Sequence, residues 1–209
     1  MKKVLLVLLM VTIAATVFAV DFSLSAHLSS GYLPYFQQLS GTPFIAFPSI
    51  GIAVGLDKVD ILAEIDFGLY RQTENKGATD EYKDRSWALG FNIGVAPKVK
   101  ASDRFSFSFP ILFKFTHLGF NTKYKNTSAW LQTSVEKQGL NAIGIDFGAR
   151  ATFAISRQWG AFIGFQAPLF TVITQGKQKL LNGTTNEGKD PGFYFLSYGT
   201  VDLGVRFTF

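Results

Sequence analysis

Apolar and polar side chains alternate with a period of two along most of the chain. Successive side chains of a β-strand point to opposite faces, so this alternation predicts strands with two different faces. In the strongest run, 105–115, Phe or Ile occupies every second position. The sequence therefore predicts eight strands, within 22–28, 44–56, 63–69, 87–95, 105–115, 143–155, 159–169 and 193–209.

The segments that connect these runs alternate in length. Short segments follow the second, fourth and sixth runs, at 57–60, 98–104 and 156–158. The other connections are long, polar and rich in Gly, Asn, Thr and Lys. This order predicts an antiparallel up-and-down meander with short turns at one end and long loops at the other. No linker interrupts it, so we expect a single domain over residues 20–209.

The two faces of the predicted strands differ in side-chain size. Bulky residues, with many of the 22 Phe, fill one face, and many of the 20 Gly lie on the other. An outer surface so rich in Gly would be weak strand material, whereas a narrow barrel interior has room for small side chains. The bulky face therefore points outward, toward lipid. Strands in hydrocarbon must pair all their backbone groups, so we predict an all-β, eight-stranded transmembrane barrel. The inward glycines are Gly51, Gly55, Gly68, Gly90, Gly94, Gly144, Gly148, Gly160, Gly164 and Gly204.

Aromatic residues near the ends of the runs fit two girdles, one at each membrane surface. The group near the long loops contains Trp87, Phe44 and Phe193. The group near the short turns contains Trp159, Phe105 and Phe22.

Four prolines conflict with a continuous strand ladder, because proline has no N–H to donate. Pro97 and Pro168 can be placed at strand ends. For Pro110 and Pro48 we expect β-bulges.

The first 19 residues have the pattern of a secretory signal. Lys2 and Lys3 precede an uncharged apolar stretch, and Val17-Phe18-Ala19 supplies small residues for cleavage after Ala19. An uncleaved N-terminal anchor is the alternative interpretation. Removal of the two lysines lowers the formal charge from +5 to +3, too little to argue for a nucleic-acid partner. The chain has no cysteine, so disulfides do not stabilise it.

The last residues resemble the C-terminal assembly signature of small eight-stranded outer-membrane proteins. Alternate apolar residues lead to a terminal aromatic, in the series Val201, Leu203, Val205, Phe207 and Phe209. The chain is similar in architecture to the OmpX, OmpA transmembrane-domain and OmpW families of diderm bacteria. This resemblance implies outer-membrane location, lipid contact, short periplasmic turns, and handling by periplasmic chaperones and the barrel-assembly machinery. It does not fix a function, because the fold is widely shared.

Charged residues on the polar face predict a network inside the barrel. Isolated charges in a narrow lumen would be costly, so we expect them to be paired. Asp146 and Arg150 face the same side and could both join a network with Lys114. One interpretation is a salt-bridged plug, and the other is a gate or selectivity filter for a small solute. The set comprises Glu64, Asp66, Lys114, Asp146, Arg150, Asp202 and Arg206.

Few residues offer catalytic chemistry. His27 and Ser29 share a face of the first strand, as a nucleophilic pair could, but both are predicted to face the lumen, away from lipid acyl chains. His117 is expected to face outward, with Gly119 where a partner serine would be needed. We predict no catalytic activity, no cofactor and no metal site. A histidine-dependent lipid-modifying enzyme is the less favoured alternative.

The long loops are rich in lysine. These lysines could pair with lipopolysaccharide or another anionic glycolipid, or the loops could bind a host surface. We predict an integral outer-membrane barrel with a structural or surface-interaction role. The alternative is a passive channel for small, including apolar, solutes, as in OmpW-like barrels. The lysines are Lys123, Lys125, Lys137, Lys177, Lys179 and Lys189.

Overall fold

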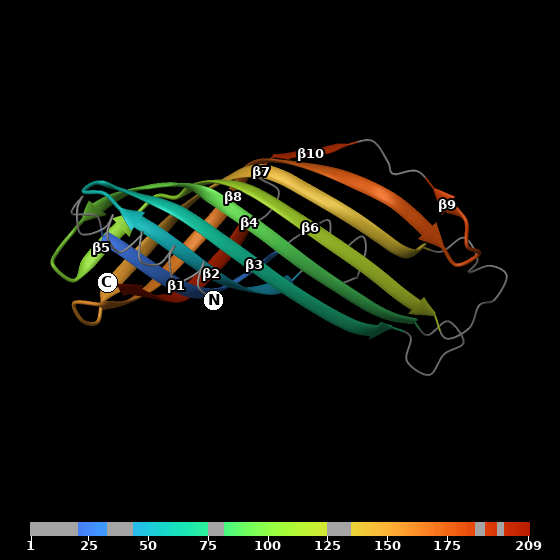
Figure 1. Ribbon diagram of the computed structural model, residues 1–209, viewed down its shortest axis with the longest axis horizontal. Coiled ribbons are helices and arrows are strands. Elements are labelled where there is room, and N and C mark those ends of the chain that lie inside the picture. The colour runs from blue at the N-terminus through green and yellow to red at the C-terminus, as the bar shows by residue number, and fades with distance from the viewer. Residues whose placement is uncertain (1–20, 33–43, 75–81, 125–134, 187–190, 196–198) are drawn as a thin grey trace, which may run out of the picture.

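All eight alternating runs lie in β-strands, two of them divided into two strands each, and the strands wrap obliquely around one long axis (Figure 1). The structure is a computed structural model that describes residues 21–32, 44–74, 82–124, 135–186, 191–195 and 199–209. The strands are β1 (Asp21–Tyr32), β2 (Phe44–Gly55), β3 (Val59–Glu74), β4 (Tyr82–Lys100), β5 (Phe105–Ser108), β6 (Ile111–Tyr124), β7 (Val135–Ala154), β8 (Trp159–Leu180), β9 (Thr185–Asn186), β10 (Gly192–Phe195) and β11 (Gly199–Thr208).

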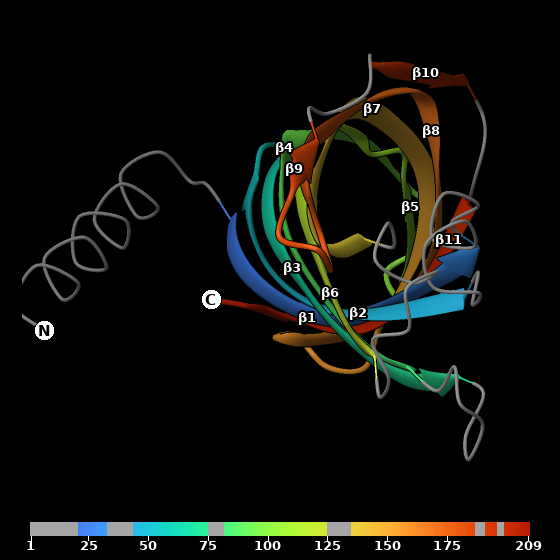
Figure 2. The ribbon, with the colours of Figure 1, turned by 90° about the vertical axis from the view of Figure 1, so that its right-hand side faces the viewer.

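The strands close into an antiparallel ring, which Figure 2 shows along the barrel axis. Neighbours in sequence pair from β1 to β4, and β5 and β6 together fill the place between β4 and β7. β7 pairs with β8, and β11 closes the ring between β8 and β1. β9 and β10 extend the β11 side of β8. The predicted eight-stranded barrel is confirmed.

The two ends of the barrel differ as predicted. Short turns join β2 to β3, β4 to β5 and β7 to β8, with backbone hydrogen bonds such as Leu56 N to Val59 O at 2.8 Å and Ile155 N to Trp159 O at 2.8 Å. At the opposite end, strands extend into segments that we assigned to loops. The β3–β4 ladder reaches Glu74 and Tyr82. Polar side chains suit a ladder that continues above the membrane into water.

The outer surface carries a continuous apolar belt. Every second residue of the strands points outward, and its large hydrophobic side chains are exposed, including Trp87, Phe193 and Trp159 of the predicted girdles. An apolar surface of this extent is suited to lipid. Among the described residues, no helix is both long and apolar enough to cross a membrane. The signal segment and the side chain of Phe44 lie outside the described part of the chain.

The predicted inward glycines face the lumen, where neighbouring side chains use the space they leave. A Cβ atom at Gly204 would lie 2.4 Å from His27 Cβ and 2.5 Å from Phe162 Cζ. No side chain fits there, so glycine allows these two rings to fill the interior next to β11.

The expectations for the prolines need correction. β5 and β6 keep one register on both sides of Pro110, so the expected bulge is absent there, and the Pro110 carbonyl accepts a hydrogen bond from Gly148 N at 2.9 Å. Pro48 also lies in a regular ladder with β1, at the point where β2 stops pairing with β3. Pro97 ends the β3–β4 ladder but not the strand, because β4 continues to Lys100 and pairs there with β5. Pro168 is not at a strand end but in the middle of β8.

A bulge in β8 accommodates Pro168. Asp146 pairs with Pro168 while Ile145 pairs with Phe170, so Leu169 is the extra residue. The bulge interrupts the β8 ladder at the residue that lacks a donor.

Candidate functional site: ionic and apolar layers of the lumen

All seven charged residues predicted to line the lumen point into it. Glu64, Asp66, Asp146, Arg150 and Asp202 are buried, with Asp202 fully inaccessible to solvent. Lys114 and Arg206 are partly buried. These residues come from β3, β6, β7 and β11, so they meet only because the sheet closes.

The first ionic group, nearest the loop end, is centred on Lys114. Its Nζ lies 3.7 Å from Asp66 Oδ2 and 3.6 Å from Asp146 Oδ2. Ser49 Oγ donates to Asp66 Oδ1 at 2.7 Å, and Asn92 Nδ2 donates to Asp66 Oδ2 at 2.9 Å. Five strands thus contribute to one polar layer across the lumen.

The second group is centred on Arg150. Its Nη2 lies 3.2 Å from Glu64 Oε1 and 4.0 Å from Asp202 Oδ2, and its guanidinium carbon is 4.4 Å from the centre of the Phe162 ring. Gln166 Nε2 donates to Asp202 Oδ2 at 2.6 Å. Arg150 thus bridges two carboxylates other than Asp66 and Asp146, and its membership of one network with Lys114 stays a prediction.

The third group, near the turn end, contains two residues that sequence reasoning missed. Asp60 accepts from Lys98 Nζ at 2.8 Å and from Arg206 Nη1 at 2.9 Å. We had assigned Asp60 and Lys98 to turns. Asp60 is an even number of residues from the inward Glu64 on β3, and Lys98 is an even number from the inward Asn92 on β4. This even spacing was the signal in the sequence that both side chains face the lumen.

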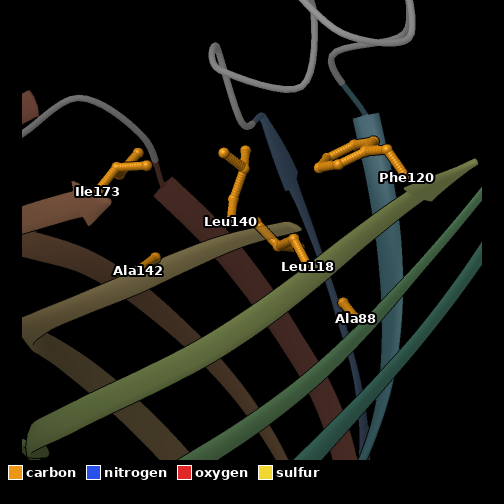
Figure 3. Close-up of a cluster of buried hydrophobic side chains, with 6 residues drawn as sticks. All are labelled: Ala88, Leu118, Phe120, Leu140, Ala142 and Ile173. Atoms are coloured by element: carbon orange, nitrogen blue, oxygen red, sulfur yellow. The ribbon is translucent and has the colours of Figure 1, made fainter. Parts of the chain in front are cut away.

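The loop-end half of the lumen contains a cluster of apolar side chains, which the sequence analysis did not predict. Six buried side chains from β4, β6, β7 and β8 project into it (Figure 3). We call this set the upper apolar cluster: Ala88, Leu118, Phe120, Leu140, Ala142 and Ile173. Phe47 and Tyr194 pack against it. It begins four residues beyond the Lys114 layer on the same strands, with Ala88 four residues from Asn92 and Leu118 four residues from Lys114.

A second, smaller apolar group lies on the turn side of the Glu64–Arg150 pair. This lower apolar cluster consists of Ala53, Leu62, Ala96 and Leu112. Leu62 lies between Asp60 and Glu64 along β3, so the lower cluster separates two ionic groups. The interior therefore alternates between ionic and apolar layers.

The two histidines are placed as predicted. His27 is buried in the lumen with its ring 5.7 Å from that of Phe162. His117 lies on the outer side, 5.1 Å from the Trp87 ring, and its Nδ1 is 2.7 Å from Asn141 Oδ1. Within the described residues, no group of three His, Cys, Asp or Glu side chains is arranged to hold a metal ion.

Exposed lysines form a row across the outside of the extended wall. Lys83 on β4 is directly opposite Lys123 on β6, and Lys137 on β7 is directly opposite Lys179 on β8. Lys179 Nζ donates to Glu136 Oε2 at 2.8 Å, and this hydrogen bond holds the pKa of the Glu136 carboxyl below its usual range. Lys125 and Lys189 lie outside the described residues.

The C-terminal strand carries the predicted apolar series on its outer face. Val201, Leu203, Val205 and Phe209 are exposed to the membrane side, and Phe207 lies between Trp159 and Phe209 with both ring centres at 5.0 Å. The last residue is fixed, because Phe209 N donates to Phe22 O at 3.0 Å. Their role as an assembly signal stays a prediction.

Comparison with known proteins identifies the fold. No family model and no curated protein matches the chain. A major outer-membrane protein of Thermus thermophilus matches 90% of this chain and 99% of its own with a TM-score of 0.55 and 9% identity. The neisserial surface protein A matches 91% of this chain and 97% of its own, with a TM-score of 0.46 and 10% identity. The attachment invasion locus protein of Yersinia pestis matches 91% of this chain and 97% of its own, with a TM-score of 0.48 and 9% identity.

At these identities the likeness shows the fold alone. The chain has the barrel fold of small outer-membrane proteins, as predicted from the sequence. Its activity has to be argued from its own residues.

Proposed function

We propose that this protein is an integral outer-membrane barrel with a closed lumen, which acts at the cell surface and not as an open pore. The observation that supports closure is the succession of ion-paired layers across the interior. Beside Arg150, Phe162 and Arg206 the enclosed void is only about 20 Å³, room for about one water molecule. Short turns would face the periplasm and the extended wall the exterior.

Conductance in planar bilayers tests the closed lumen. The refolded protein should give no stepwise currents, whereas Arg150→Ala should open a path by removing the side chain that bridges Glu64 and Asp202. Lys179→Ala, which breaks an ion pair outside the lumen, is the matched control and should stay silent. Stepwise currents from the unmodified protein would instead support the passive channel.

The lysine row supports a surface role toward an anionic glycolipid such as lipopolysaccharide. Like charges directly opposite each other destabilise a sheet, and Lys83 with Lys123 is such a pair. Lys83 is four residues beyond Trp87, roughly 13 Å along the strand, which sets the row above the aromatic girdle. Phosphate groups at that height would neutralise the lysines.

Thermal unfolding in vesicles with and without lipopolysaccharide tests this partner. Lipopolysaccharide should raise the unfolding temperature of the unmodified protein more than that of a Lys83→Ala, Lys123→Ala variant. Lys100→Ala is the control, since Lys100 pairs with Asp103 at the opposite end of the barrel. An equal rise in all three proteins would contradict the proposed glycolipid contact.

A further inference from the structure

The wall of the barrel has a seam between β2 and β3. Their ladder begins at Gly55 and Asp60 and ends at Ser49 and Asp66, although both strands continue. β2 stays paired with β1 as far as Phe44, and β3 stays paired with β4 as far as Glu74. In Figure 2 the loop ends of β2 and β3 diverge, β2 toward the right and β3 toward the lower right. No backbone pairing joins residues 44–48 to 67–74 in the described structure.

The seam opens at the depth of the apolar belt. Leu69 lies in the part of β3 that is not paired with β2, and it pairs with the girdle residue Trp87 on β4. The residues of β3 where pairing with β2 stops therefore lie on the membrane side of that girdle. Leu69 is 84% exposed and Phe67 43%. Backbone groups without partners are costly in hydrocarbon, so an opening at this depth among the described residues needs a function or a partner to explain it.

One aromatic ring covers the seam from inside. Phe47 lies next to the seam on β2, and a Cβ atom added to Gly68 would lie 2.4 Å from Phe47 Cε1. The ring therefore lies directly over Gly68 of β3, where a larger residue would exclude it. Phe47 also packs against the upper apolar cluster. Phe47 therefore lies between the upper apolar cluster and the seam.

We propose that this seam is a lateral portal through which an acyl chain of an outer-leaflet lipid enters the upper half of the lumen. At the depth of Phe67 and Leu69 the surrounding medium is hydrocarbon, and the cluster behind Phe47 offers it an apolar surface. The acyl chain would stop at the layer of Ser49, Asp66 and Lys114, because passing it would break the ion pairs and hydrogen bonds of that layer. The interior thus combines the upper apolar cluster with a polar floor.

The proposal rests on the membrane placement proposed above, and one labelling experiment distinguishes failure of either. The protein is refolded into vesicles that contain phosphatidylcholine with a diazirine at the end of one acyl chain, illuminated, and mapped by mass spectrometry. We expect labels on the outward belt and also on Leu118 and Leu140 of the upper apolar cluster. Leu62 and Leu112 of the lower apolar cluster, beyond the polar floor, are the internal control and should stay unlabelled.

Two changes to the seam sharpen the test. Phe47→Ala should increase labelling of Leu118 several-fold, whereas Phe162→Ala, an inward aromatic below the floor, should not. Because the chain has no cysteine, the seam can be closed with a short bismaleimide between Ala46→Cys and Leu69→Cys, which should reduce the labelling of Leu118.

The control for the cysteine cross-link joins two neighbouring strands that are paired. Ala26 and Val205 are directly opposite each other on β1 and β11, and joining Ala26→Cys to Val205→Cys should leave the labelling unchanged. A labelled belt with an unlabelled upper cluster would overturn the portal, and so would equal labelling of the upper and lower clusters. An unlabelled belt would overturn the membrane placement itself.

Discussion

Replacement of Arg150 by methionine is the most informative change to the ionic layers. The Nη2 atom of Arg150 lies 3.2 Å from Glu64 Oε1 and 4.0 Å from Asp202 Oδ2. Glu64 is 2% exposed and Asp202 0%. At an effective dielectric constant of about 20, two unit charges 3.2 Å apart interact with about 5 kcal/mol. Removing one partner of a buried ion pair costs about 3–5 kcal/mol, because the other charge is left uncompensated. Gln166 still donates to Asp202, so the loss falls mainly on Glu64.

The assay is reversible urea unfolding of the refolded protein in phospholipid vesicles. We expect Arg150→Met to lower the free energy of unfolding by about 3–5 kcal/mol. A double variant, Arg150→Met with Glu64→Gln, should lose less, since it removes the uncompensated charge as well. Lys179→Met breaks the exposed pair with Glu136 and should cost much less, because water screens an exposed pair. If Arg150→Met costs no more than this control, the layer is hydrated and the reasoning about burial fails.

Three further changes test other parts of the wall. Gly119→Val should lower the free energy of unfolding by about 1–3 kcal/mol, since its Cβ would lie 2.3 Å from Trp87 Nε1; Gly139→Val on the paired strand meets its nearest atom at 3.5 Å and serves as control in the same urea assay. Deletion of Phe209 should reduce the amount of protein in outer-membrane fractions measured by immunoblot, and normal amounts would exclude a role in assembly. Asp60→Asn leaves two cations at the turn end without their carboxylate, so the urea assay should give a loss above that of Lys179→Met.

Most of the fold prediction rested on the alternation of apolar and polar side chains with a period of two. It gave the eight strands, the outward belt and the inward direction of Glu64, Asp66 and Asp202, because strand geometry links parity to face. It could not give the partners of the charges. Whether Arg150 meets Lys114 or Glu64 depends on the tilt and stagger of the closed ring, and these are set by pairings between strands far apart in sequence.

The upper apolar cluster was missed for a different reason. Leu118, Phe120 and Leu140 lie in segments where small and polar residues blur the alternation, and we had assigned these segments to loops. The strands continue there because a paired ladder satisfies its own backbone groups whatever medium surrounds it. The bulge at Leu169 and the seam at Ser49 are likewise local interruptions of register, which single prolines permit but do not specify.

The ionic layers also have a consequence for strand register. A slip of one residue would turn every inward charge of a strand toward lipid, at about 2–4 kcal/mol for each Arg or Lys near the midplane. A slip of two residues keeps the faces but shifts a side chain by roughly 7 Å, too far for Arg150 to reach Glu64 across a separation now 3.2 Å. An apolar filling would tolerate the second slip, since one aliphatic contact replaces another. The pairs that close the lumen therefore also select one register of the barrel.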